Sequence, residues 1–179
     1  MEINYLQAAL LGLCACLASL PGMGGTTVGN YTLGRPLVGG LVVGLILGDV
    51  QTGVIVGAAI QIVYIALVTP GGTVSADVRA VTYIGIPLSI LAIHANNLDP
   101  SSVAASSMAA TLGAAVGTLG TVLFYGTATL NLVWQSIGWK ALESKDWKKI
   151  KRTLPLVDFV YPWVSHILFS FIQIGRAHV

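Results

Sequence analysis

The sequence predicts an all-α integral membrane protein, a multi-span helical bundle that includes re-entrant half-helices. Of its 179 residues, 55% are hydrophobic and 9% are charged, whereas a soluble domain carries about 25% charged residues. Helices are expected because each span must satisfy its backbone internally, and the alternating pattern of barrel strands is absent. A spanning helix needs about 20 apolar residues. Stretches near or above that length without Asp, Glu, Lys or Arg are residues 3–34, 80–98, 100–139 and 159–175.

The first part of the chain contains one predicted helix and two shorter apolar arms. The helix is expected at about residues 4–20, followed by a glycine-rich break and a polar, uncharged loop that contains Asn30. The arms, about residues 37–47 and 52–68, flank Asp49. The first arm is too short to cross a membrane upright, which predicts a half-helix or a re-entrant arm. Small residues every four positions let helix backbones approach closely, and the arms carry Gly40, Gly44, Gly48, Gly53 and Gly57.

Longer apolar segments make up the rest of the chain. We expect a helix at about residues 78–94 with a kink at Pro87, and then a polar turn at 96–102. The next segment, about residues 103–134, exceeds the length of one span, so it must tilt, kink or contain two pieces. A last segment is expected at about residues 156–173.

A basic loop is predicted at residues 140–152. By the positive-inside rule this loop is cytoplasmic. Two interpretations stay open: a solvated loop that only sets the topology, and a docking surface for a soluble partner. The loop is too short and too acidic to suggest nucleic-acid binding. Its basic residues are Lys140, Lys145, Lys148, Lys149, Lys151 and Arg152, and Glu143 and Asp146 oppose them.

Polar groups inside the apolar stretch 34–80 are the candidate functional residues. Ionisable groups at membrane depth are costly, so they usually face a protein interior or a water-filled path. Asp49 can cap a helix at the break between the arms or accept a hydrogen bond from a ligand. Gln61 lies in the middle of an apolar run, where an unpaired amide costs roughly 2–7 kcal/mol. It therefore needs either an interhelical bond or a ligand.

Asp77 follows a Pro-Gly-Gly break and lies two residues before Arg79. Helix capping or pairing with Arg79 explains it, and it is also the strongest single candidate for a ligand contact, with Arg79 keeping it ionised. Arg35, at the edge of an apolar run, is expected to extend to the membrane interface. His94 and His166 are interpreted as satisfied or interfacial histidines. The candidate substrate-binding residues are Asp77, Gln61, Asp49, Thr73 and Asn30.

Catalytic and metal-binding motifs are absent from the sequence. It contains no Walker loop, HExxH, GxSxG or CxxC pattern. Cys14 and Cys16 are two residues apart, on different faces of the predicted first helix, and are interpreted as small buried residues. Nothing supplies an activated nucleophile, so we expect no catalytic residue, no covalent chemistry on this chain, and neither a cofactor nor a metal.

Several short motifs lie in and around the apolar stretch 34–80. They are Gly34-Arg35-Pro36, the run from Gly44 to Asp49, Gln51-Thr52-Gly53, and Pro70-Gly71-Gly72-Thr73 leading to Asp77. These motifs resemble the IIC subunit of mannose/fructose/sorbose-type phosphotransferase systems. The resemblance implies a sugar permease subunit of a bacterial inner membrane, in an oligomeric complex with a IID membrane subunit and soluble IIA and IIB phosphocarriers. It also implies a mobile core that carries the sugar inward, where it is phosphorylated on release.

The predicted function is therefore translocation of a hexose-type sugar, with Asp77, Gln61 and Asp49 lining the site. An ion-coupled secondary transporter and a non-transporting membrane scaffold remain alternatives, because broken helices also occur in the first class. Residues 174–179 match the translation of a common sequencing-adapter oligonucleotide. We expect residues 1–173 to be a membrane-embedded permease domain that the natural chain continues, and residues 174–179 to be a non-native tail.

Overall fold

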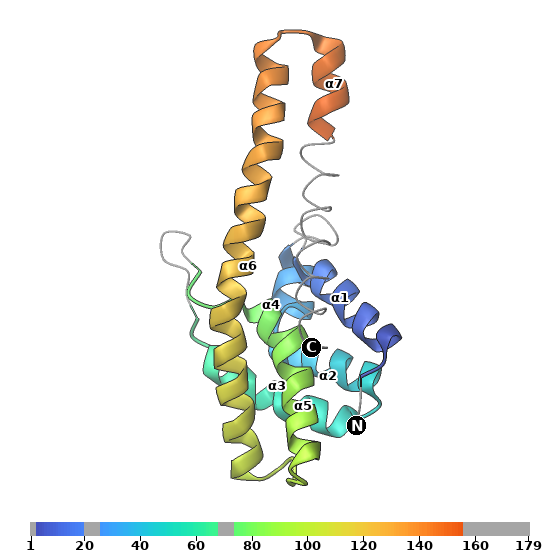
Figure 1. Ribbon diagram of the computed structural model, residues 1–179, viewed down its shortest axis with the longest axis vertical. Helices are drawn as coiled ribbons and strands as arrows, with labels where there is room; N and C mark the ends of the chain where they lie inside the picture. The colour runs from blue at the N-terminus through green and yellow to red at the C-terminus, as the bar shows by residue number, and fades with distance from the viewer. Residues whose placement is uncertain (1–2, 20–25, 68–73, 156–179) are drawn as a thin grey trace.

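The computed structural model describes residues 3–19, 26–67 and 74–155, and every regular element within these ranges is a helix (Figure 1). The all-helical prediction is therefore confirmed. Two helical segments are long and apolar enough to cross a membrane, Val78–Ala95 and Val103–Glu143. The breaks predicted around residues 20–25 and 69–73, the last predicted segment with His166, and the tail at 174–179 lie outside the described residues.

Helix α1, Tyr5–Ser19, matches the predicted first helix. Asn4 and Gln7 cap its N-terminus reciprocally, because each backbone N–H donates to the other's side-chain oxygen, at 3.0 and 2.8 Å. The prediction of a polar loop after this helix is wrong, because Thr26–Leu33 forms a π-helical segment, η1. The N–H of Gly34 donates to the carbonyl of Gly29 at 2.8 Å, five residues back. Backbone groups must find internal partners in an apolar environment, which favours helix over open loop.

Helices α2, Pro36–Leu47, and α3, Val50–Tyr64, form the two predicted short arms as an antiparallel hairpin. Their lengths, about 18 and 22 Å, are less than the roughly 30 Å of a bilayer core. Gly48 makes the turn with a φ of 81°, a left-handed conformation that favours glycine. A Cβ added to Gly40 would lie 2.5 Å from the carbonyl oxygen of Gly53. The glycines therefore permit backbone contact, as the spacing predicts.

The central helical segment joins α4, Val78–Ala80, to η3, Val81–Gly85, and α5, Ile86–Ala95. A π-helical turn ends two residues before Pro87, the position of the predicted kink. Proline has no N–H to donate to the preceding turn, and a π turn accommodates that irregularity. This segment forms much of the core, and its fully buried side chains include Val81, Thr82, Tyr83, Ile86, Ser89, Ile90 and Ile93.

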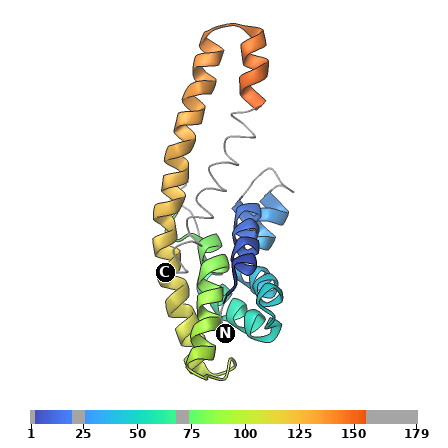
Figure 2. The same cartoon turned by 45° about the vertical axis from the view of Figure 1, so that its right-hand side comes forward.

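Helix α6 is one continuous helix of 41 residues, Val103–Glu143, that begins after the predicted polar turn. Its length is about 60 Å, roughly twice a bilayer core. The sequence allowed this segment to tilt, to kink or to consist of two pieces. The last possibility is wrong, because the helix is continuous and no proline interrupts it. The lower half packs against α3, η3 and α5, with Gly113 and Gly117 at the contacts with α3 and η3. The upper half extends away from this bundle (Figures 1 and 2).

Helix α7, Trp147–Pro155, folds back beside the end of α6 (Figure 1). The prediction that residues 140–152 form a loop is therefore wrong. Lys140 lies in the last turn of α6, and four of the basic residues lie on α7. Asp146 caps α7 by accepting from the N–H of Lys148 at 2.9 Å. Ala141, near the end of α6, and Ile150, in the middle of α7, are both buried. This apolar packing explains why a charged segment becomes helical.

Candidate functional site

A cavity of about 250 Å³ lies between η1, the start of α2, the start of α4 and the middle of α6. It contains the best sequence-based candidate, Asp77, together with two arginines and two aromatic rings. Its volume is close to the lower end of the range for small-molecule sites, about 300 Å³. The polar and aromatic residues that line it are Tyr31, Arg35, Asp77, Arg79 and Phe124.

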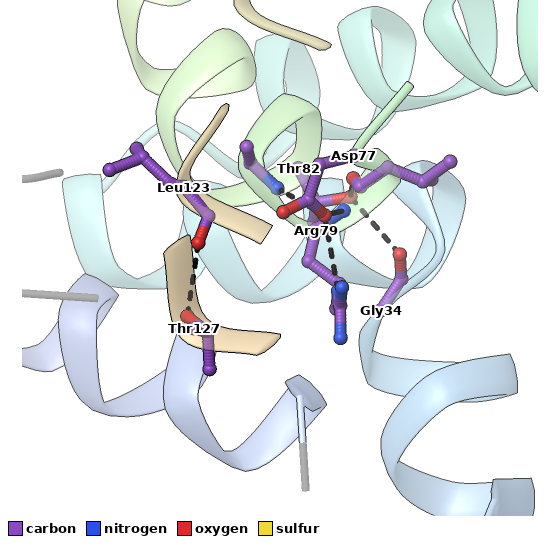
Figure 3. A network of polar contacts seen from close by, with 8 residues as sticks. Gly34, Asp77, Arg79, Thr82, Leu123 and Thr127 are labelled. Carbon is purple, nitrogen blue, oxygen red and sulfur yellow. Dashed lines mark hydrogen bonds and ion pairs between the residues drawn. The ribbon is translucent and has the colours of Figure 1, made fainter. Parts of the chain in front are cut away.

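Asp77 is 6% exposed and is held by three donors. Nε of Arg79 donates to Oδ1 at 3.1 Å, and so do the backbone N–H groups of Arg79 at 3.0 Å and Ala80 at 3.4 Å (Figure 3). Both structural roles predicted for Asp77, capping of a helix and pairing with Arg79, are thus present. All three donors meet Oδ1, and among the described residues Oδ2 accepts no hydrogen bond. Within the described part of the chain, Oδ2 therefore keeps its capacity to accept a hydrogen bond.

Each arginine of the cavity lies over an aromatic ring. The guanidinium carbon of Arg79 is 5.3 Å from the centre of the Phe124 ring, and that of Arg35 is 5.6 Å from the centre of the Tyr31 ring. Cation–π attraction at such distances contributes about 0.5–2 kcal/mol, depending on exposure. The rings consequently restrict the positions of both cations.

Buried hydroxyl groups fix the Arg35 side of the cavity to the central helical segment. The hydroxyl of Tyr83 donates to the carbonyl of Leu33 at 2.9 Å. Oγ1 of Thr82 lies 3.4 Å from the carbonyl oxygen of Gly34 (Figure 3). Thr82 also donates to the carbonyl of Val78 at 2.8 Å. Consecutive residues of the π turn therefore hold the two residues that precede Arg35.

Helix α6 holds Asp77 from the opposite side. The backbone N–H of Asp77 donates to the carbonyl of Gly117 at 2.9 Å. A Cβ added to Gly120 would lie 2.8 Å from Cβ of Asp77 and 2.6 Å from Cβ of Ala80. Only a glycine at position 120 lets the start of α4 approach α6 this closely, so the glycine stripe of α6 determines the place of the carboxylate.

The other predicted site residues lie in different places. Gln61, on α3, has a buried Oε1 without a hydrogen-bond partner among the described residues, and it does not line the cavity. Asn30 lies in η1 beside Tyr31, and its side chain is outside the described residues. Thr73 is likewise outside them and precedes Val74, which lines the cavity.

Asp49 lies at the other end of the bundle. It caps α3 by accepting from the N–H of Thr52 at 3.1 Å, and its Oδ2 lies 2.7 Å from Nε2 of His94. Because His94 follows Asp77 by 17 residues of continuous helix, the two carboxylates are about 25 Å apart. Burial raises the pKa of Asp49, but hydrogen bonds from Thr52 and the contact with His94 outweigh this, so the pKa lies below its ordinary value. The structure thus does not bring Asp49 and Asp77 together.

Comparison with known proteins identifies the family. The family described as the phosphotransferase system sorbose-specific IIC component matches residues 5–177. The chain belongs to this family. The resemblance noted from the sequence motifs is therefore confirmed.

Three relatives of this IIC chain cover different parts of it. An N-acetylgalactosamine permease IIC component of Escherichia coli K12 is 37% identical over 90 residues, which are 50% of this chain and 65% of the relative. The mannose-specific EIIC component of the same organism is 31% identical over 90 residues, 50% and 32% of the two chains. The sorbose-specific EIIC component of Klebsiella pneumoniae is 29% identical over 150 residues, which are 84% of this chain and 51% of the relative. The IIC chain thus spans less than two thirds of each relative.

Two solved structures share the fold. One is the cryo-EM structure of the mannose transporter ManYZ in complex with microcin E492, with a TM-score of 0.70 and 24% identity, covering 99% of this IIC chain and 64% of that chain. The other is a membrane protein with a TM-score of 0.64 and 23% identity. The match covers 99% of this IIC chain and 66% of that chain. These matches confirm the helical membrane fold.

Four residues that shape the cavity of this IIC chain were not among the predicted contacts: Tyr31, Arg35, Arg79 and Phe124. Arg35 was assigned to the membrane interface, and Arg79 only to pairing with Asp77. The available signal was the pair of arginines at the two edges of the apolar stretch 34–80. Within the described ranges, no three His, Cys, Asp or Glu side chains gather closely enough to hold a metal ion.

Proposed function

We propose that this chain is the sugar-translocating IIC subunit of a phosphoenolpyruvate-dependent phosphotransferase system. It binds a hexose-type sugar in the Asp77 cavity and carries it inward for phosphorylation by a partner IIB subunit. The observation that carries the proposal is the buried carboxylate of Asp77, which lines the cavity and keeps Oδ2 without a partner among the described residues.

The chemistry of the cavity suits a polyhydroxylated ligand. A sugar hydroxyl donates to Oδ2 of Asp77, and hydrogen bonds to charged groups contribute about 1.5–3 kcal/mol. The guanidinium of Arg79 lies beside the same carboxylate and offsets the cost of an ionised group at membrane depth. The remaining N–H groups of Arg79 are donors for hydroxyl oxygens. One ion pair therefore supplies both an acceptor and donors.

The other candidates have secondary places in this proposal. Gln61, Thr73 and Asn30 are further proposed ligand contacts. The buried Oε1 of Gln61, which has no hydrogen-bond partner among the described residues, supports the first of these. Asp49 is too far from Asp77 to bind the same sugar, so we propose it as a contact only for a sugar that enters or leaves at the opposite end.

We further propose that the chain works in a bacterial inner membrane with a IID membrane subunit and with soluble IIA and IIB phosphocarriers. The fold of the mannose transporter relative, which was solved as ManYZ, supports a membrane partner. The six basic residues between Lys140 and Arg152 support a cytoplasmic position for residues 140–152. The turn between α6 and α7 would then face the soluble subunits.

Uptake by cells that carry the complete transport system tests the function. Radiolabelled mannose, sorbose and N-acetylgalactosamine are supplied separately to cells with the wild-type chain, Asp77→Asn or Asp99→Asn. Asp99 is the matched control, since it is an exposed carboxylate in the turn before α6. We expect Asp77→Asn to lower uptake of the transported sugar at least tenfold, and Asp99→Asn to leave it within twofold of the wild type.

The product and the energy source separate the proposal from its alternatives. Uptake that needs phosphoenolpyruvate and yields a phosphorylated sugar supports a phosphotransferase permease. Uptake of unmodified sugar that stops when the proton or sodium gradient is dissipated rejects it in favour of an ion-coupled transporter. Wild-type uptake by a correctly inserted Asp77→Asn variant rejects the assignment of the site.

A further inference from the structure

Arg35 is a cation of the cavity that has no acidic partner among the described residues. The ion pairs formed by the described residues are Arg79 with Asp77 and His94 with Asp49, and no described carboxylate lies within 4.0 Å of the Arg35 guanidinium. Arg35 and Arg79 line the cavity together with a single carboxylate, Asp77. The described wall of the cavity therefore carries one positive charge in excess, which a neutral sugar leaves uncompensated.

We propose that Arg35 forms a subsite for a phosphate monoester, so that the cavity binds a phosphorylated sugar as well as the free sugar. This inference rests on the proposed function, because a sugar phosphate is the product of the proposed system. The planar guanidinium matches the oxygens of a phosphate group and binds them through two parallel hydrogen bonds.

The surroundings of Arg35 hold its guanidinium in place. The side chain lies over the Tyr31 ring at 5.6 Å. Its backbone is fixed on both sides, because Tyr83 and Thr82 contact the carbonyls of Leu33 and Gly34, and Pro36 begins α2 directly after it. Less freedom is consequently lost when an anion binds, which favours affinity.

Asp77 and Arg35, which both line the cavity, differ in charge in a way that orients such a ligand. Oδ2 of Asp77, which accepts no hydrogen bond from a described residue, attracts hydroxyl donors and repels a phosphate. Arg35, in contrast, attracts a phosphate and has no acceptor for hydroxyl donors. A sugar phosphate would thus place its hydroxyls at Asp77 and its phosphate at Arg35. The subsite predicts that Arg35 distinguishes the phosphorylated sugar from the free sugar.

Calorimetric titration of the full chain in its membrane complex tests this subsite. The complex is placed in nanodiscs of neutral phosphatidylcholine and titrated with mannose, mannose 6-phosphate and inorganic phosphate. We expect Arg35→Gln to weaken binding of mannose 6-phosphate and of inorganic phosphate at least tenfold, and to change mannose binding less than twofold. Arg35→Lys keeps the charge but not the planar fork, so we expect an intermediate loss. Arg152→Gln, an exposed residue of α7, is the matched control and leaves all three affinities unchanged.

The inorganic phosphate measurement separates this inference from the proposed function. Phosphate binding that depends on Arg35, without any binding of mannose, supports the subsite and counts against a mannose-binding function. If the complex binds mannose, and Arg35→Gln leaves the affinities for mannose 6-phosphate and inorganic phosphate unchanged, the subsite is overturned and the proposed function is not. Equal losses for all three probes also overturn it, since they indicate a structural role.

A lipid headgroup is the other source of the same chemistry. If Arg35 holds an anionic lipid instead, wild-type complexes in phosphatidylcholine bind neither mannose 6-phosphate nor inorganic phosphate. In that case the wild type also retains phosphatidylglycerol through purification, and Arg35→Gln loses it. That result overturns the sugar-phosphate subsite. Phosphate affinity that survives in phosphatidylcholine and disappears in Arg35→Gln supports it.

Discussion

Oδ2 of Asp49 lies 2.7 Å from Nε2 of His94, and this contact joins the turn of the α2–α3 hairpin to the C-terminal end of α5. The two residues are 45 positions apart in the chain. The contact thus fastens the hairpin, whose arms are too short to cross a membrane, to a helix that is long enough to do so.

A double-mutant cycle measures how strongly this contact holds the hairpin. We expect Asp49→Asn and His94→Gln each to lower the thermal stability of the detergent-solubilised protein, with a coupling energy of about 0.2–1 kcal/mol, because both side chains are partly exposed. The unfolding free energies of the two single variants and of the double variant provide this number. Strictly additive losses would show that the contact contributes nothing.

Acidification is expected to weaken the same end of the molecule. The pKa of Asp49 is lower in the folded protein than in the unfolded chain, so its stabilising effect is complete above the unfolded value of about 4. The effect is lost as the pH falls through the folded pKa, because the unfolded chain then binds a proton more readily. Melting temperatures measured between pH 6 and pH 3 should therefore fall less in Asp49→Asn than in the wild type. Identical profiles for the two proteins contradict this.

The contact between the two arms of the hairpin predicts a large effect of one methyl group. In Gly53→Ala the added Cβ would lie 2.5 Å from the carbonyl oxygen of Gly40, which cannot move without moving α2. We expect a loss of about 1–3 kcal/mol in unfolding free energy, as for overpacked cores. Leu45→Ala, on the exposed face of α2, is the control and should cost much less. Comparable losses in both variants would argue against close backbone packing of the arms.

The glycines of α6 allow the position of Asp77 to be tested apart from its charge. In Gly120→Ala the new methyl group would meet Cβ of Asp77 and of Ala80, both close to the backbone, so the start of α4 must shift. We expect sugar uptake to fall at least tenfold in the proposed transport assay, although Asp77 remains. Gly113→Ala meets the flexible end of Ile60 at 3.3 Å and should retain most of the uptake. Equal uptake by the two variants would contradict the positioning role of Gly120.

Elements that depend on residues close together in the sequence could be predicted, and their presence is confirmed. The presence of α1, of the two hairpin arms and of the polar turn before α6 follows from runs of apolar residues and from glycine breaks. The bounds of the second arm differ, because α3 covers Val50–Tyr64 and not the predicted residues 52–68. The capping roles of Asp49 and Asp77 follow from their positions directly before helices. Each of these features depends on residues within a few positions of one another.

Features that depend on distant contacts could not be predicted in the same way. The polar stretch before Gly34 is π-helical partly because it packs on α1, and the basic segment after Glu143 is helical because it packs on α6. The cavity combines residues around positions 31–35 and 74–79 with Phe124. Likewise, nothing in the sequence near Asp49 indicates a partner 45 residues away. Only the tertiary structure places Asp49 and Asp77 at opposite ends of the bundle.

The uninterrupted course of α6 gives the molecule a lever. The carbonyl of Gly117 holds the backbone of Asp77, and about 26 residues of stiff helix separate this point from Glu143, a distance of roughly 39 Å. A rotation of about 10° at Gly117 would swing the far tip by roughly 7 Å by the same helical rise. Small displacements beside the sugar cavity would thus be magnified, through a single rigid rod, at the cationic tip.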